Sequence, residues 1–167
     1  FTIGEKLSYK IAYGIIEAGN ADLEVKSITS QPECYRVVAK GYTNFAFDWL
    51  FKVRDHYESI IDSSSMKPKF FIRNVREGNT KFDQFYTFNH NERIVNTGEK
   101  NIAIPDNVQD MVSCYFYARA LNLKNLKIDT VLSFNSIVDG EIYNLKVKYL
   151  GKEPIKIEAG KFNALKF

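Results

Sequence analysis

The 167-residue sequence is poor in the residues that carry most catalytic and metal chemistry. It contains two cysteines, Cys34 and Cys114, and two histidines, His56 and His90, and none of them belongs to a CxxC or other metal-binding spacing. A metal site needs three or four converging ligands. No G-x-S-x-G elbow and no glycine-rich phosphate loop is present. These absences predict no metal, no cofactor and no catalytic residues, so the sequence is interpreted as that of a non-enzymatic protein.

Charge and hydropathy argue against two further classes of protein. The net charge is only +3, from 23 Lys plus Arg against 20 Asp plus Glu, and the lysines are scattered singly along the chain. Nucleic-acid binding would favour a clustered basic stripe. No apolar run approaches the roughly 18 residues that span a bilayer. We therefore expect no nucleic-acid partner and no transmembrane segment.

Aromatic residues, in contrast, are abundant. Thirteen Phe, ten Tyr and one Trp make up 14% of the chain, and such side chains suit half-buried pleated surfaces. Apolar and polar residues alternate with a period of two, and short turns rich in Gly, Asn, Asp and Ser separate the alternating runs. Strands are predicted at about residues 6–15, 21–26, 34–42, 52–61, 67–76, 81–89, 93–96, 130–138, 141–150, 155–158 and 162–167. Glu17–Asn20 is predicted to be the turn of the first hairpin.

One helix is predicted, over about residues 106–121. Asp106 follows a proline and has Gln109 three residues later, which is a capping-box pattern. Met111 and Tyr115 then belong to a wide apolar sector, which indicates contact on more than one side.

The expected fold class is therefore mainly β. We expect an antiparallel curved sheet, or half-open β-barrel, with the helix packed against its concave side. The chain is expected to form a single domain over residues 1–167. Because it stops within a predicted strand and starts without methionine, we also expect further C-terminal strands and a removed leader in the natural protein. The spacing of the cysteines leaves both a disulfide and two buried free thiols open.

The aromatic residues exceed what one core face requires. The stretch FAFDWLF at residues 45–51 holds four rings, and it is expected to close one end of the curved sheet. Two readings stay open, a filled core or a cavity that holds a hydrophobic ligand, since burying a Phe by itself stabilises a fold by roughly 1.5–3 kcal/mol. The residues predicted to contact such a ligand are Phe45, Phe47, Trp49, Phe51, Phe70, Tyr86, Met111 and Tyr115.

An unrecognised enzyme is the remaining alternative. It would need a cleft with converging polar groups, and the stretch Asp55, His56 and Glu58 is where the sequence would place one. Alternation along a strand puts Asp55 on one side of the sheet and the other two residues on the opposite side.

Several short motifs occur in an order that resembles a known family. They are Gly4–Tyr9, Ala18–Gly19, Phe51–Asp55, Glu58–Asp62, Pro68, Asp110–Ser113 with Arg119 and Leu121, and Gly160–Phe162. The sequence resembles DUF3108, a family of uncharacterised exported bacterial proteins. The resemblance implies a signal peptide, a periplasmic location and a half-barrel similar to the lipoprotein carriers of the bacterial envelope, whose concave apolar face holds acyl chains. It supplies no catalytic residues.

The function expected from these observations is binding of a lipid or a lipoprotein acyl chain in a curved-sheet cavity. The alternative is a structural or protein-interaction module of the envelope with a filled core and no ligand. An accessible apolar cavity of a few hundred Å³ would favour the first, and a filled interior with an exposed apolar patch would favour the second. The sequence leaves the oligomeric state open.

Overall fold

The computed structural model describes residues 1–14, 16–123 and 126–167 of the chain. Antiparallel strands and one helix make up the fold, as the sequence predicts. The strands are β1 (Lys6–Tyr13), β2 (Ile16–Ser27), β3 (Cys34–Thr43), β4 (Arg54–Asp62), β5 (Pro68–Glu77), β6 (Thr80–Asn89), β7 (Ile94–Asn96), β8 (Asn101–Ala103), β9 (Val131–Val138), β10 (Glu141–Lys148), β11 (Gly151–Ile157) and β12 (Gly160–Lys166). The short strand β8 is absent from the sequence prediction.

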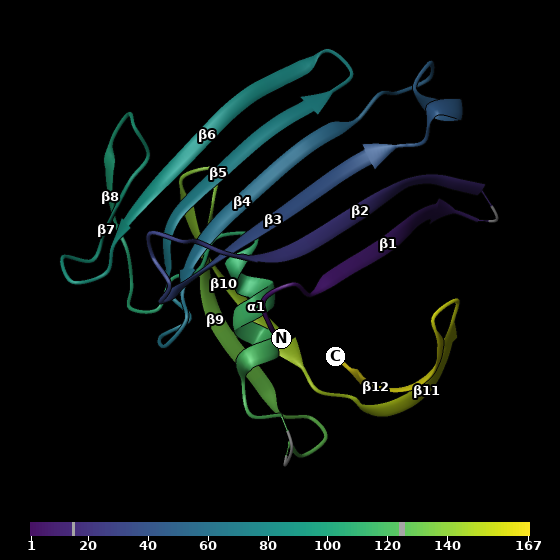
Figure 1. Cartoon of the computed structure of the whole chain (residues 1–167). Coiled ribbons are helices and arrows are strands. Elements are labelled where there is room, and N and C mark those ends of the chain that lie inside the picture. The colour runs from purple at the N-terminus through teal and green to yellow at the C-terminus, as the bar shows by residue number, and fades with distance from the viewer. Residues whose placement is uncertain (15, 124–125) are drawn as a thin grey trace.

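The first eight strands form one sheet whose spatial order follows the chain, from β1 to β8. This sheet curves into a trough, and two separate hairpins, β9–β10 and β11–β12, lie across its concave side (Figure 1). The sheets do not close into a barrel, which confirms the predicted half-open architecture.

The two faces of the trough follow from the strand register. Phe71 pairs with Tyr86 and both side chains are buried on the concave face, whereas the adjacent Phe70 pairs with Thr87 on the convex face. The concave residues join one core with residues of the segments around the helix. Its fully or nearly buried members are Val25, Val37, Ile61, Phe71, Tyr86, Phe88, Val95, Ile104, Val108, Val112, Phe116 and Ile137.

Helix α1 (Ser113–Ala120) lies within the trough, between the large sheet and the β9–β10 hairpin (Figure 1). Phe116 is completely buried, and the ring of Phe1 meets it edge-on with centroids 4.9 Å apart. The helix therefore fills the middle of the concavity. In the part of the chain that the structure describes, no helix is long and apolar enough to cross a membrane.

The helix starts later than the sequence indicates, so the predicted range of 106–121 is too long. Asp106 is exposed and pairs with Lys67 at 2.7 Å, and it does not cap the helix. The cap is Asp110, whose Oδ1 accepts hydrogen bonds from the backbone N–H groups of Val112 and Ser113, both at 2.8 Å. The Ser113 hydroxyl accepts in turn from the Asp110 N–H at 2.8 Å, a reciprocal arrangement like a capping box.

The residues before the cap are extended because they pair with the second sheet. The Gln109 N–H donates to Asn135 O at 2.9 Å, and Ile137 N–H donates to Gln109 O at 2.8 Å. A second link joins the β9–β10 turn to the large sheet, since Arg73 donates to Asp139 Oδ1 at 2.7 Å. These contacts hold the β9–β10 hairpin across the trough.

The first hairpin also differs from the prediction. Glu17–Asn20 lies inside β2, and Tyr13 pairs with Ile16, so the reversal occurs before the predicted turn. Ile15, predicted as the end of the first strand, lies outside the described residues. Gly19 allows the backbones of β2 and β3 to lie close together, because a Cβ atom at this position would come within 2.5 Å of the Tyr42 carbonyl oxygen. Of the two states left open for the cysteines, the structure has free thiols, but only Cys34 is buried, whereas Cys114 is half-buried.

Candidate functional site

An apolar cavity of about 260 Å³ lies beside α1, on the side of the helix that faces the two hairpins. Its walls come from α1 and the residues after it, from β9 and β10, and from the last residue of the chain. They are Tyr115, Ala118, Arg119, Leu123, Leu132, Phe134, Val147 and Phe167. Apart from Arg119 and the Tyr115 hydroxyl these side chains carry no polar group, so the cavity suits an apolar guest.

The cavity does not end at these walls. A second hollow of about 340 Å³ shares Arg119 and Leu123 with it and continues between Leu121, Lys152 and Leu165. Ligand sites commonly occupy roughly 300–1,000 Å³. The two neighbouring hollows therefore have the size expected for a small amphiphile.

Arg119 is the charged group of this site. Its Nη2 lies 2.7 Å from Glu5 Oε1, and its guanidinium is stacked 5.4–5.6 Å from the ring centroids of Phe1, Tyr115 and Phe116. Among the described residues its buried Nη1 has no hydrogen-bond partner. A buried donor without an acceptor is costly, so this nitrogen is suited to an oxygen atom of a guest.

A wider hollow of about 640 Å³ opens between β1 and the turn of the β11–β12 hairpin. Tyr9 lies on its wall and shares a 2.7 Å hydrogen bond with the Tyr115 hydroxyl, which links β1 to the helix. Burial, followed by this hydrogen bond, raises the pKa of Tyr9 to about 12. The Lys10–Glu158 ion pair at 2.7 Å spans the gap. The open side of the trough is thus crossed by side chains and not by strand pairing.

The FAFDWLF stretch forms a loop between β3 and β4 that we call the aromatic loop, residues 45–51. It begins with the 3₁₀ turn Phe45–Phe47 and lies at the end of the large sheet. Its rings do not close the trough as expected: the exposed fractions are 92% for Phe45, 83% for Trp49 and 52% for Phe51. Leu50 is 68% exposed as well. The loop therefore presents an apolar surface to its surroundings.

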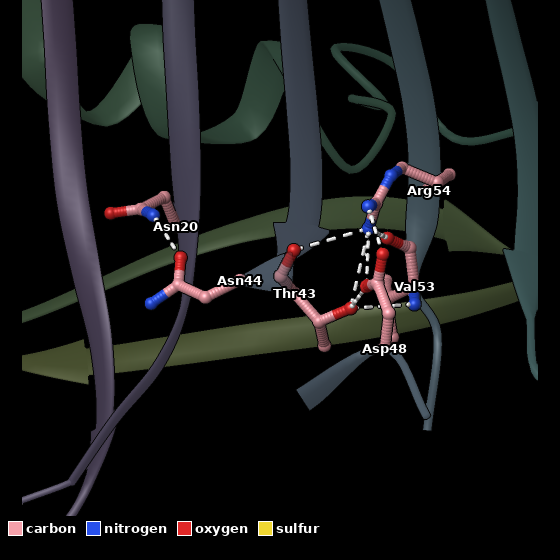
Figure 2. Close-up of polar contacts among 6 residues, drawn as sticks. All are labelled: Asn20, Thr43, Asn44, Asp48, Val53 and Arg54. Atoms are coloured by element: carbon pink, nitrogen blue, oxygen red, sulfur yellow. Dashed lines mark hydrogen bonds and ion pairs between the residues drawn. The ribbon is translucent and has the colours of Figure 1, made fainter. Parts of the chain in front are cut away.

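A polar network holds the base of this loop (Figure 2). Asp48 accepts hydrogen bonds from the Thr43 hydroxyl at 2.7 Å and from both terminal nitrogens of Arg54. The Thr43 hydroxyl in turn accepts from the Val53 N–H at 3.1 Å. The hydrogen bond from Thr43, followed by the contact with Arg54, lowers the pKa of the Asp48 carboxyl. Asp48 is therefore an anion that the base of the loop already neutralises.

A second set of contacts fixes the start of the loop to β2. Asn44 Oδ1 accepts from Asn20 Nδ2 at 2.8 Å, while Asn44 Nδ2 donates to the Glu17 carbonyl at 2.9 Å. The Asn44 backbone N–H also donates to Ala18 O at 2.9 Å. Three strands therefore anchor the aromatic loop, so its exposed rings are held in place by ordered structure (Figure 2).

The family model described as "Protein of unknown function (DUF3108)" matches residues 8–167. The chain belongs to the DUF3108 family. No curated protein and no solved structure matches the chain. The matched range of this DUF3108 protein contains both the aromatic loop and all the residues that line the cavity beside α1, while Phe1 and Glu5 precede it.

The structure separates the residues that the sequence nominates as ligand contacts. Phe45, Phe47, Trp49 and Phe51 belong to the aromatic loop, while Phe70 is on the convex face and Tyr86 is buried in the core. Met111 is exposed before the helix. Tyr115 is the one that lines the apolar cavity beside α1.

The other cavity residues of this DUF3108 protein were missed because they look like ordinary strand residues in the sequence. Leu132 and Phe134 are separated by Ser133 in β9, and Val147 lies between two lysines in β10; this alternation predicts strands but does not show what the apolar side chains face. Arg119 is visible in the sequence as a lone arginine in the last turn of the predicted helix, but a cation there is also favoured by the helix dipole, so its position alone does not indicate a binding site.

The stretch Asp55, His56 and Glu58 does not form a cleft site. Glu58 lies on the convex face in a bidentate pair with Arg36, at 2.7 and 2.8 Å. Asp55 lies on the concave face and accepts a hydrogen bond from the Arg76 N–H at 2.9 Å. Within the described residues, no three His, Cys, Asp or Glu side chains are grouped as metal ligands would be.

Proposed function

We propose that this DUF3108 protein binds the acyl chain of a lipid or lipoprotein in the bacterial cell envelope, without catalysing a reaction. The observation that carries the proposal is the apolar cavity between α1, β9–β10 and Phe167. The half-open fold agrees with a carrier, because one side of the trough is not closed by strand pairing in the part of the chain that the structure describes. The cavity shares Arg119 and Leu123 with the second hollow between Leu121, Lys152 and Leu165, which gives a chain-like guest room to extend.

Arg119, the charged residue that lines the cavity, limits the kinds of ligand that would fit. The unpartnered Arg119 Nη1 is a donor beside an otherwise apolar wall. A molecule with a long apolar chain and a carbonyl, carboxylate or phosphate oxygen near one end would satisfy both features. Fatty acids, phospholipids and acylated peptides share that chemistry.

Filling the cavity is expected to abolish binding of an acyl probe. Ala118 lines the cavity, so Ala118→Phe places a ring in the space that the chain would occupy. We expect the affinity for a dansyl-labelled fatty acid, measured by fluorescence titration, to fall roughly tenfold or more, since a displaced chain forfeits several buried methylenes. Thermal stability should change little because the ring enters existing space.

The matched control is Ala120→Phe, which makes the same substitution at an exposed position of the same helix. It is expected to bind the probe like the wild type. Native mass spectrometry of the purified wild type should show co-purified lipid. A wild type that neither binds the probe nor carries lipid would contradict the proposal and support the alternative, an interaction module with no ligand. Equal binding by Ala118→Phe would place the chain elsewhere.

A further inference from the structure

The aromatic loop is an unusual use of apolar residues. Phe45, Trp49, Leu50 and Phe51 are each more than half exposed, although they lie within seven positions of one another. Scattered exposed apolar residues need no explanation, but a group of large ones at one tip marks a surface that meets something else. The loop projects from the end of the large sheet beyond β3 and β4 (Figure 1).

The loop presents these residues on an ordered backbone. Phe47 N–H donates to Asn44 O at 2.8 Å, and the N–H groups of Leu50 and Phe51 both donate to Phe47 O, at 2.9 and 3.0 Å. Together with the network around Asp48, these bonds turn the polar groups of the loop inward (Figure 2). The outer surface is left to side chains that bury well in an apolar medium.

The charged residues around the aromatic loop indicate what kind of surface the loop would contact. Asp48 is neutralised by Arg54, whereas Lys52 is exposed and makes no ion pair with the described residues. The Phe51 ring lies against the β5–β6 turn at Gly78, and the same end of β6 carries Lys81, which is also exposed and without an ion pair in the described part of the chain. Exposed aromatic rings thus stand beside two lysines without an ion pair in the described residues, and Glu77 at the end of β5 is the acidic residue near them.

We propose that the aromatic loop inserts into the interface of a membrane that contains anionic lipids. Trp and Phe side chains favour the boundary between headgroups and acyl chains, and neighbouring lysines gain from the negative surface potential. A projecting tip with a rigid base is suited to penetration of a soft interface. This inference goes beyond the proposed acyl-chain binding, since it needs only the loop and holds whether the cavity is occupied or empty.

Trp49 makes the proposal directly measurable, because it is the single tryptophan of the chain and its side chain in the aromatic loop is 83% exposed. We expect its emission to shift to the blue when the protein is mixed with phosphatidylcholine vesicles containing phosphatidylglycerol. Lipids brominated on their acyl chains should quench it. Vesicles of phosphatidylcholine alone should bind less, and Lys52→Glu should remove part of the preference for anionic vesicles.

The variant Phe45→Ser with Leu50→Ser keeps Trp49 as the probe and removes two of the inserting side chains. We expect its vesicle partitioning to fall roughly tenfold or more, from the lost burial of two large apolar groups. The matched control is Ile3→Ser, which removes a 55% exposed apolar side chain far from the loop. It should bind vesicles like the wild type, and circular dichroism verifies the fold of both variants.

Three outcomes would overturn the proposal. The first is the absence of a blue shift and of quenching with anionic vesicles. The second is equal partitioning by the loop variant and the wild type. The third is a blue shift that appears without vesicles and grows with protein concentration, which would assign the loop to contact between copies of the chain.

Discussion

Replacing Phe116 with alanine is expected to lower the free energy of unfolding by about 3–5 kcal/mol, the usual range for deleting a buried ring. Phe116 is the completely buried residue by which α1 meets the core of the trough, and the Phe1 ring packs edge-on against it. The loss has two parts, the burial of the ring and the cavity that it leaves. Urea denaturation followed by far-ultraviolet circular dichroism would measure it.

The matched control is Phe45→Ala, which deletes the same ring where it is 92% exposed. Its effect is expected to stay within about 0.5 kcal/mol, as for other surface changes. Similar losses for the two variants would mean that the helix does not supply the core of the trough. The contrast also tests the environment of the aromatic loop independently of any vesicle.

Replacing Asp110 with alanine is expected to cost about 2–4 kcal/mol, because a helix cap and a buried hydrogen-bond acceptor are lost together. Asp110 is completely buried, and its Oδ2 accepts from the Ser59 hydroxyl of β4 at 2.6 Å. The cap therefore also fastens the helix to the large sheet. Asp106→Ala, at the exposed position that the sequence nominates as the cap, should leave the unfolding transition nearly unchanged.

Asp110 also predicts a specific pH dependence. Burial raises its pKa from 3.8 to about 6, against the hydrogen bonds from Ser59, Ser113 and Val112. The folded state therefore binds a proton that the unfolded chain has already released between these values. The stability that this proton contributes is fully present below pH about 4 and is lost as the pH rises through about 6.

Asp110→Asn resembles the protonated acid and cannot titrate, so it isolates this contribution. Relative to the wild type, its free energy of unfolding should rise by roughly 2–3 kcal/mol between pH about 4 and pH about 7. Taking the difference between the two proteins cancels the other carboxyl groups, such as Asp62, whose pKa is lowered by hydrogen bonds from Ser64 and Ser65. A difference that stays flat with pH would show that Asp110 titrates normally.

The strands and the curved architecture could be predicted because alternation is a local property. The start of the helix could not be predicted, because two consecutive stretches each place an aspartate three residues before a polar side chain. Asp106 with Gln109 and Asp110 with Ser113 look alike in the sequence. The choice is made by distant partners, since Ser59 binds Asp110 and β9 pairs with Gln109 in extended form. Tertiary contacts therefore override the first pattern.

The candidate site was less predictable for a similar reason. The letters of FAFDWLF indicate burial, yet the hydrogen bonds of Asp48 and Asn44 turn the backbone so that the rings point outward. The cavity is built from β9, β10, α1 and Phe167, which are brought together by the packing of two sheets around one helix. Among the residues that line this cavity, Tyr115 is the one that the sequence predicts as a ligand contact, because it belongs to the apolar sector of the predicted helix.

The order of the large sheet has a consequence for how the chain folds. Because β1 to β8 neighbour one another in space as they do in sequence, each pairing can form as a hairpin with a short loop to close. The contacts across the open side are of the opposite kind, since Tyr9 meets Tyr115 and Lys10 meets Glu158 over separations of 106 and 148 residues. Long loops close slowly and late. We therefore expect the trough to form first and its mouth to be completed last.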